Sequence, residues 1–204
     1  MNRGFLIVLA ILALAFAIIT GVAVKNGLLG PAQQQTAAIG GPFQLVDTTG
    51  KPTDQSVLKG KWSAVFFGYT FCPDVCPTTL YALGQAEKQL GPKANDFQTV
   101  FISVDPARDT PRQMANYLSN SAFPRHAIGL TGTPAQVATA AKAYKVYYQA
   151  EGSGSDYTVN HSGFIYLMNP KGRFACVMPY NTTPDQIAAK VKTAMAGGSN
   201  ADSC

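Results

Sequence analysis

An uninterrupted apolar run near the start of the chain, GFLIVLAILALAFAIITGVAV (residues 4–24), constrains the fold more than any other feature. Its length matches the roughly 20 residues that an α-helix needs to cross a bilayer. Cleaved signal peptides have a shorter apolar core, of about 7–15 residues, and a small-residue cleavage site. No cysteine follows the run to suggest a lipoprotein. Residues 1–25 are therefore predicted to be a short cytoplasmic stub and an uncleaved transmembrane anchor, with a cleaved signal as the alternative.

The charges beside this run predict its orientation. Arg3 and the terminal amine precede it, and the single Lys25 follows it. Cytoplasmic flanks of membrane helices carry the excess of lysine and arginine. We therefore expect a single-pass protein of the bacterial inner membrane, with its N-terminus in the cytoplasm and its globular domain in the periplasm. That compartment permits disulfides.

Composition divides the rest of the chain into three parts. Residues 26–41, NGLLGPAQQQTAAIGG, have no hydrophobic period and predict a flexible linker. Residues 42–197 predict one globular domain, and residues 198–204 predict a polar tail. The net charge of +5 comes from lysines and arginines scattered singly or in pairs. Without a basic run, nucleic acid is excluded as the expected partner.

Strand patterns are clearest in the following segments. Residues 62–67 (WSAVFF) and 97–104 (FQTVFISV) are apolar and rich in aromatic and β-branched side chains, which is typical of buried strands. Residues 43–47 (FQLVD) lead into a turn, TTGK. Residues 164–168 and 173–178 flank NPKG, which is a turn signal, and so predict a β-hairpin.

Three helices share one kind of start: TPRQ at Thr110, TPAQ at Thr133 and TPDQ at Thr183. Each combines a threonine N-cap, a proline at the first helical position and the glutamine of a capping box. A fourth helix is predicted over PTTLYALGQAEKQL, from Pro77. The resulting order is β-β-α-β-α-β-α, followed by a hairpin and a final helix. This order indicates an α/β sandwich around a mixed sheet.

Two cysteines lie close together in GYTFCPDVCPTTL. Cys72 falls in the turn after the strand at 62–67, and Cys76 falls near the start of the next helix. The amides and the dipole of a helix N-terminus favour a thiolate, and open α/β folds bind ligands at the carboxyl ends of their strands. The pair is interpreted as a disulfide, a redox dithiol or a metal clamp. A bridge over so short a loop would stabilise the fold only weakly.

His161, in VNHSGFIYL, immediately precedes the strand predicted at 164–168. If that strand runs antiparallel to the central ones, His161 lies at the same edge as Cys72 and Cys76. Two thiolates and an imidazole suit copper or zinc, whereas a closed zinc site takes four protein ligands. The other histidine, His126, is expected at the surface or beside a site, but not as a ligand.

Three motifs in order, GYTFCPDVCPTTL, FISVDPARDTP and YTVNHSGFIYLMNPKGRF, closely resemble the signature regions of the Sco/SenC family. The resemblance spans about residues 43–195 and implies a thioredoxin-like fold on one N-terminal membrane anchor. It also implies that each domain binds one copper ion, as Cu(I) and/or Cu(II). The copper ligands of the family carry over onto Cys72, Cys76 and His161.

The acidic positions of these motifs carry over in the same way. They fall on Asp74, Asp105 and Asp109, which are expected to surround the ligands or to form the rim that a partner contacts. One departure is visible, because Asn160 stands where many members of the family have aspartate. This difference is expected to loosen a contact to His161.

The resemblance implies a membrane-anchored copper metallochaperone, not an enzyme, that helps to assemble the dinuclear copper centre of cytochrome c oxidase subunit II. Its partners would be that subunit, a periplasmic copper donor and the membrane. The alternative is a thiol–disulfide reductase that keeps the cysteines of that centre reduced, with Cys72 and Cys76 as its catalytic residues. Dithiol enzymes of this fold usually have CxxC and a proline before the facing strand, whereas this chain has CxxxC and NHSG.

Two further cysteines belong to none of these motifs. Cys176 alternates with apolar neighbours in RFACVM and is expected to be a small core residue. Cys204 ends the polar tail and is expected to be a free thiol, with pairing to Cys176 as the alternative.

Overall fold

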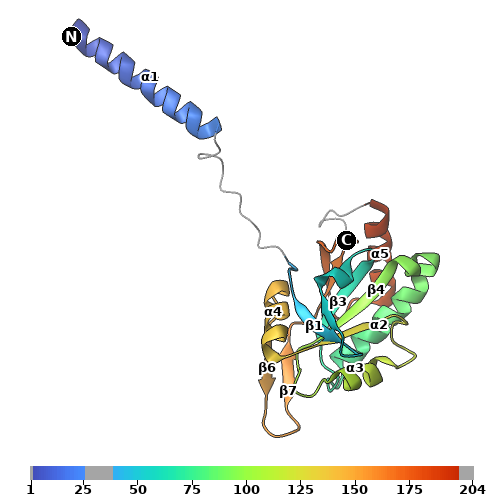
Figure 1. Cartoon of the computed structure of the whole chain (residues 1–204). Coiled ribbons are helices and arrows are strands. Elements are labelled where there is room, and N and C mark those ends of the chain that lie inside the picture. Colours follow the sequence, from blue (N-terminus) through green and yellow to red (C-terminus); the bar gives the residue numbers. More distant parts are fainter. Residues whose placement is uncertain (1, 26–38, 198–204) are drawn as a thin grey trace. The chain divides into compact units, whose positions relative to one another are not determined.

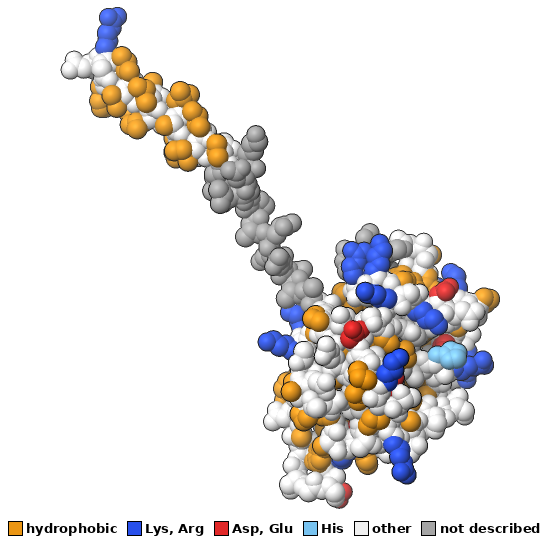
Figure 2. Space-filling view, in the orientation of Figure 1, with side chains coloured by type: hydrophobic (Ala, Val, Ile, Leu, Met, Phe, Trp, Pro, Cys, Tyr) orange, Lys and Arg blue, Asp and Glu red, His pale blue; other side chains and the backbone are white. Residues whose placement is uncertain are grey.

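The computed structural model describes residues 2–25 and 39–197, and the chain forms two compact units, 1–37 and 38–204. In the first unit, α1 (Arg3–Lys25) is a continuous helix. Its segment Arg3–Val22 has a mean hydropathy of 3.0 and is a candidate membrane span. Apolar side chains are exposed along α1, as Figure 2 shows. The predicted linker and polar tail lie largely outside the described residues.

The second unit is built on a seven-stranded mixed sheet with the order β2-β1-β5-β4-β3-β8-β9 (Figure 1). Strands β3, β4 and β5 are parallel, and β1 and β8 run antiparallel to β5 and β3. Two more strands pair with each other in a separate small sheet. The bounds of the main strands are β1 (Gln44–Asp47), β2 (Pro52–Asp54), β3 (Trp62–Gly68), β4 (Phe97–Ser103), β5 (Ile128–Thr131), β8 (Phe164–Met168) and β9 (Phe174–Pro179). The small sheet consists of β6 (Tyr148–Glu151) and β7 (Thr158–His161).

Four helices surround the main sheet: α2 (Val75–Leu90), α3 (Pro111–Leu118), α4 (Pro134–Tyr144) and α5 (Pro184–Gly197). Two 3₁₀ turns, η1 (Gln55–Leu58) and η2 (Gly91–Asp96), join other elements. The predicted caps are present, because the Thr110 and Thr133 hydroxyls accept bonds from the third-residue amides, and Thr133 forms a full capping box. The mixed α/β fold predicted from the sequence is confirmed.

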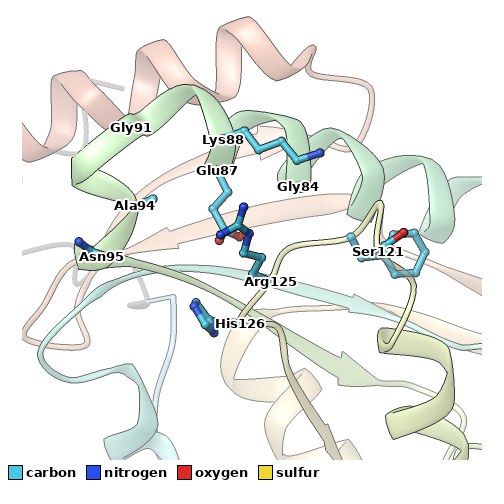
Figure 3. Close-up of a pocket in the computed structure, with 10 residues that line it drawn as sticks. Gly84, Glu87, Lys88, Gly91, Ala94, Asn95, Ser121, Arg125 and His126 are labelled. Carbon is cyan, nitrogen blue, oxygen red and sulfur yellow. The ribbon is translucent and has the colours of Figure 1, made fainter.

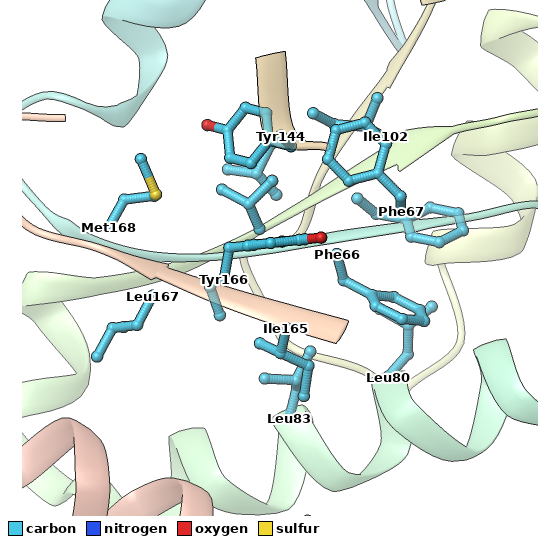
Figure 4. Packing of buried hydrophobic residues seen from close by; sticks show 14 of the residues in the cluster. Phe66, Phe67, Leu80, Leu83, Ile102, Tyr144, Ile165, Tyr166, Leu167 and Met168 are labelled. Atoms are coloured by element: carbon cyan, nitrogen blue, oxygen red, sulfur yellow. The ribbon is translucent and has the colours of Figure 1, made fainter. Parts of the chain in front are cut away.

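The core lies on both faces of the two central strands. All seven residues of β3 and all seven of β4 are buried. Figure 4 shows side chains of α2, including Leu80 and Leu83, on one side of the sheet and Tyr144 of α4 on the other. Phe67 packs against Tyr144 with ring centroids 5.3 Å apart. Each fully buried aromatic or leucine side chain contributes about 1.5–3 kcal/mol of transfer free energy, so the end of β3 is firmly placed.

Candidate metal centre

The cysteine turn leaves the carboxyl end of β3 and enters α2. This helix begins at Val75, two residues before the predicted start at Pro77, so Cys76 lies inside its first turn. Cys76 is fully buried, whereas Cys72 is half-buried in the turn. The Cys72 amide donates to the Tyr69 carbonyl at 3.2 Å, which closes the turn. Neither cysteine is part of a disulfide.

The sulfur of Cys72 caps the N-terminus of α2. Asp74 occupies the N-cap position, but its side chain makes no capping bond. Instead, the Cys76 amide donates to Cys72 Sγ at 3.3 Å. Amides at a helix N-terminus have no partner within the helix, so a negative sulfur is stabilised at this position.

The two cysteines differ sharply in acidity. The pKa of Cys72 is lowered to about 4, first by the hydrogen bond with the Cys76 side chain and then by His161 and by the amides of Asp74 and Cys76. Burial opposes this lowering without outweighing it. The pKa of Cys76 is raised, mainly because burial disfavours its thiolate. At neutral pH the site therefore holds one thiolate, at Cys72, and one thiol.

His161 reaches the cysteines from the end of β7. Its Nε2 lies 3.5 Å from Cys76 Sγ, and its Nδ1 lies 3.2 Å from the Ser162 carbonyl oxygen. With the proton on Nδ1, that nitrogen donates to the carbonyl and the Nε2 lone pair faces the sulfur, whereas with the proton on Nε2 the ring can donate to a thiolate. The edges of Phe66 and Tyr69 meet the imidazole at centroid distances of 6.3 and 6.0 Å, which fix the plane of the ring.

Cys72, Cys76 and His161 thus form one group, in which every pair of ligand atoms lies within 4.8 Å. The antiparallel pairing of β8 with β3 brings them together, because it places the start of β8 beside the end of β3. Cys72 and His161 line a pocket of about 310 Å³, and Cys76 lies beneath them. Two sulfurs and one imidazole are soft or borderline donors, which suit copper.

Gly68 leaves room for this arrangement at the end of β3. A Cβ at this position would lie 2.7 Å from Cys76 Sγ and 2.8 Å from a ring carbon of Phe101. Both distances are too short for non-bonded atoms, so only glycine lets the buried sulfur approach the strand this closely. This requirement was not recognised from the sequence.

The acidic residues differ from the sequence expectation. Asp74 is exposed, but Asp105 and Asp109 are 4% and 0% exposed, so these two do not lie on a surface rim, which leaves a place around the ligands as the expectation for them. Asp109 accepts hydrogen bonds from the Thr70 amide at 3.1 Å, the Thr70 hydroxyl at 2.6 Å and the Ser103 hydroxyl at 2.7 Å. The same burial raises the pKa of Asp109. This carboxyl group therefore ties the start of the cysteine turn to the end of β4.

The second buried acid is bound to residues that the sequence analysis did not single out. Asp105 accepts from Arg108 and from the Tyr157 hydroxyl, both at 2.5 Å. The sequence also did not indicate a role for Tyr69, whose hydroxyl accepts a hydrogen bond from the Val159 amide at 3.2 Å. The one available signal was the position of Arg108 inside the motif SVDPARDTP, three residues after Asp105.

His126 lies apart from the metal group. It is exposed and lines a pocket beside the C-terminal half of α2, together with Glu87, Lys88 and Arg125 (Figure 3). Within the described residues, the group that could hold a metal ion does not include it. Its expected place at the surface agrees with this position.

Cys176 is buried in β9, as expected of a core residue. It is also disulfide-bonded, which the expectation of a small core residue did not include. Alternation with apolar neighbours indicates burial equally well for a thiol and for a half-cystine, and the sequence pattern could not separate them. The prediction about Cys204 falls outside the described residues.

A mixed-sheet domain of thioredoxin-like fold, with a Cys-Cys-His group at the end of its central strand, defines the class of this protein. The SCO1/SenC family model matches residues 31–196. The chain belongs to the SCO1/SenC family, as its three motifs indicated.

Individual relatives agree with this assignment. The chain is 43% identical over 168 residues to "Protein SCO1 homolog 1, mitochondrial" of Arabidopsis thaliana, covering 81% of this chain. It is also 43% identical over 158 residues to "Protein SenC" of Rhodobacter capsulatus, covering 76% of this chain and 70% of that protein. The structure of Bradyrhizobium japonicum ScoI with copper bound matches with a TM-score of 0.69 and 46% identity, over 76% of this chain and 98% of that chain. The match spans only 48% of the length of the Arabidopsis protein.

Proposed function

We propose that this protein is a copper carrier that holds one copper ion through Cys72, Cys76 and His161. One observation carries the proposal: two sulfurs and one imidazole nitrogen converge within 4.8 Å at the carboxyl end of the central strand. A related ScoI, 46% identical, has been solved with copper bound. The family is tied to the assembly of cytochrome c oxidase, and we extend that role to this chain.

The donor set explains the preference for copper. Thiolate and imidazole ligands together bind copper in preference to hard cations such as Mg²⁺ or Ca²⁺. Cys72 is already a thiolate, and the Cys76 thiol releases its proton when the ion binds. Three protein ligands hold the ion and leave a coordination position for a further ligand, whereas a structural zinc site is closed by four protein ligands. Such a site suits a carrier, because ligands of the recipient can bind the copper ion before the ligands of the carrier dissociate from it.

We propose the dinuclear copper centre of cytochrome c oxidase subunit II as the recipient, and a periplasmic copper donor as the source. Helix α1, with its candidate span Arg3–Val22, would keep the domain at the inner membrane with the metal centre in the periplasm. Tagging of the C-terminus for accessibility from the periplasm tests this topology. A tag reached only from the cytoplasm would contradict it.

A second role is favoured by the acidity of the sulfurs. Cys72, whose pKa is about 4, is a nucleophilic thiolate at neutral pH, and Cys76 lies close enough to resolve a mixed disulfide. Cys72 would attack a substrate disulfide, break its S–S bond and form a mixed disulfide, with release of the first substrate thiolate. Cys76 would then lose its proton to that thiolate and attack the Cys72 sulfur, which releases the second substrate thiolate. The substrate disulfide would gain two electrons, and Cys72–Cys76 would become a disulfide. This is the reductase alternative.

His161 separates the two roles. Both need the cysteines, but thiol–disulfide exchange needs no imidazole ligand. His161→Ala should abolish copper transfer to a subunit II fragment while reduction of a model disulfide persists. The two assays are run side by side, with His126→Ala as the control because that histidine lies outside the metal group. A His161→Ala protein that still transfers copper at the wild-type rate would favour the reductase.

A further inference from the structure

The strand that carries His161 is not part of the main sheet. Among the described residues, β7 pairs only with β6, and together they form a separate two-stranded hairpin. Tyr148 is the residue paired with His161. Only Ser162 and Gly163 separate His161 from β8, so the β3–β8 pairing places the end of β7 near the cysteine turn, but no backbone ladder in the described part of the chain joins the hairpin itself to the core. Side-chain contacts between the hairpin and its neighbours therefore complete its placement.

Arg108 supplies several of these contacts from the loop between β4 and α3. Its Nη1 donates to the Tyr157 carbonyl at 2.9 Å and to the Ser155 carbonyl at 3.2 Å, both on the hairpin. Its Nε donates to Asp105, which lies on the same loop as Arg108. Asp105 also accepts the Tyr157 hydroxyl, so the carboxylate and the guanidinium hold the same hairpin residue. Hydrogen bonds that involve ionised groups are the strong members of their class.

The cysteine turn meets the same guanidinium. The Arg108 guanidinium carbon lies 3.6 Å from the ring centroid of Tyr157, 4.8 Å from that of Phe71 and 5.8 Å from that of Tyr69. Phe71 directly precedes Cys72 in the chain. Tyr69 packs against His161 and accepts the Val159 amide. Arg108 therefore lies between the segment that carries the sulfurs and the hairpin that carries the imidazole.

We propose that Arg108 is a positioning residue that holds His161 within reach of the cysteines and thereby sets how tightly copper is held. This inference rests on the proposed function, and it concerns a residue that does not itself bind the ion. A planar guanidinium can stack on rings through its faces while its edge donates in two directions, and lysine cannot do both. Loss of Arg108 lets the hairpin shift and moves His161 from the position in which it completes the copper site.

The decisive experiment is a double-mutant cycle in the full-length protein in detergent. Cu(I) affinity is measured by competition with a chromogenic chelator for wild type, Arg108→Gln, His161→Ala and the double variant. Residues that orient a ligand typically contribute about 10–100-fold to metal affinity, and Arg108→Gln should fall in that range. In the His161→Ala background the same change should alter affinity by no more than about twofold, because the residue on which it acts is gone.

Arg112→Gln is the matched control, because Arg112 is an exposed arginine four residues further along the chain. It should leave copper affinity unchanged. An equal loss on removing Arg108 in both backgrounds would show that Arg108 supports the cysteines or the whole fold, and would overturn the proposal. An Arg108→Gln protein with wild-type affinity would overturn it as well. A wild-type protein that fails to bind Cu(I) would instead refute the proposed function.

A readout without metal tests the same idea independently of copper. The Val159 amide bonds to Tyr69 across the gap between hairpin and turn. In Arg108→Gln its protection against hydrogen exchange should fall, while amides of β4 keep theirs. Tyr157→Phe retains the stacked ring but loses the hydroxyl bond to Asp105, and it should cause a smaller loss at the same amide. Unchanged protection of Val159 in both variants would contradict the proposed role of Arg108.

Discussion

The sulfurs and the imidazole of the metal centre are held by regions that differ in their attachment to the core. The cysteines lie between β3, whose seven residues are all buried, and the first turn of α2. His161 lies on a hairpin whose strands pair only with each other among the described residues. The comparison teaches that the sulfur side is part of the folded body, whereas the imidazole side is an arm joined to that body by side chains and by the two-residue link to β8. The following predictions test this contrast, from the largest expected effect to the smallest.

Loss of either sulfur should have the largest effect on metal binding. Cys76→Ser and Cys72→Ser should each weaken Cu(I) binding at least about 100-fold, equivalent to about 2.7 kcal/mol. Their effects on stability should differ. Cys76 is 0% exposed, so a serine there buries a hydroxyl at a cost of about 1–2 kcal/mol, whereas the half-buried Cys72 should tolerate serine.

Chelator competition and urea unfolding measure these two quantities. His161→Ala is the comparison from the other side of the site, and it should unfold at nearly the wild-type urea concentration. If Cys76→Ser proved as stable as His161→Ala, the division into folded body and attached arm would be wrong.

Two glycine substitutions compare the same two sides. Gly68→Ala places a methyl group 2.7 Å from Cys76 Sγ and 2.8 Å from Phe101, inside the packed core, and should destabilise by about 1–3 kcal/mol. Gly163→Ala places a methyl group 2.8 Å from the ring of Tyr180. That ring is 43% exposed and can swing outward, so this change should cost less than about 1 kcal/mol. Equal losses of unfolding free energy in the two variants, measured by urea unfolding, would contradict the difference between the sulfur side and the imidazole side.

The acidity of Cys72 predicts a specific pH dependence in the metal-free protein. Thiolate absorbance in the ultraviolet should rise with a midpoint near pH 4, because the lowered pKa of Cys72 is about 4. At pH 6 Cys72 is ionised, whereas an ordinary thiol is almost wholly protonated. The weaker intrinsic nucleophilicity of an acidic thiolate cancels most of this gain, which leaves an alkylation rate about 3–10-fold above that of a free cysteine.

Mass spectrometry after brief treatment with iodoacetamide at pH 6 measures this rate. The label should lie on Cys72 and not on the buried Cys76. Cys72→Ser, which leaves Cys76 as the other thiol of the pair, is the control. Preferential labelling of Cys76 would contradict the assignment of the thiolate.

Asn160→Asp on the hairpin should have the smallest effect. Asn160 is exposed, and its Nδ2 contacts the Glu151 carboxylate at 3.5 Å. A carboxylate in its place faces a like charge, but solvent screens the pair, so the change in stability should stay below about 0.5 kcal/mol. A large change in copper affinity, measured by the same chelator competition, would show that residue 160 acts on His161 more directly than these contacts indicate.

Much of this fold was predictable because its signals are local. The central strands are continuous apolar runs, and a threonine cap marks the start of α3 and of α4. The approach of His161 to the cysteines was also predictable, since it follows from one assumption about strand direction that the β3–β8 pairing fulfils.

The remaining features depend on contacts between distant residues. The hairpin strands β6 and β7 are short and largely exposed, so they have no apolar period to mark them. Burial of Asp109 depends on Thr70, 39 residues away, and the contacts of Arg108 depend on a hairpin about 50 residues away. Charged side chains normally lie in solvent. Their partners therefore had to be seen in space before these residues could be understood.

The self-contained pairing of β6 and β7 also bears on how such a site can diversify. The strands of the hairpin pair with each other through four cross-strand residue pairs. The tip of the hairpin contains Gly152 and Gly154, both with positive φ. Residues at this tip can be inserted, removed or exchanged without taking a strand out of the main sheet. The appendage that supplies the imidazole can therefore change by small steps in length and sequence. The tip of the hairpin is open to variation, while His161 at its base and the two sulfurs lie next to the main sheet.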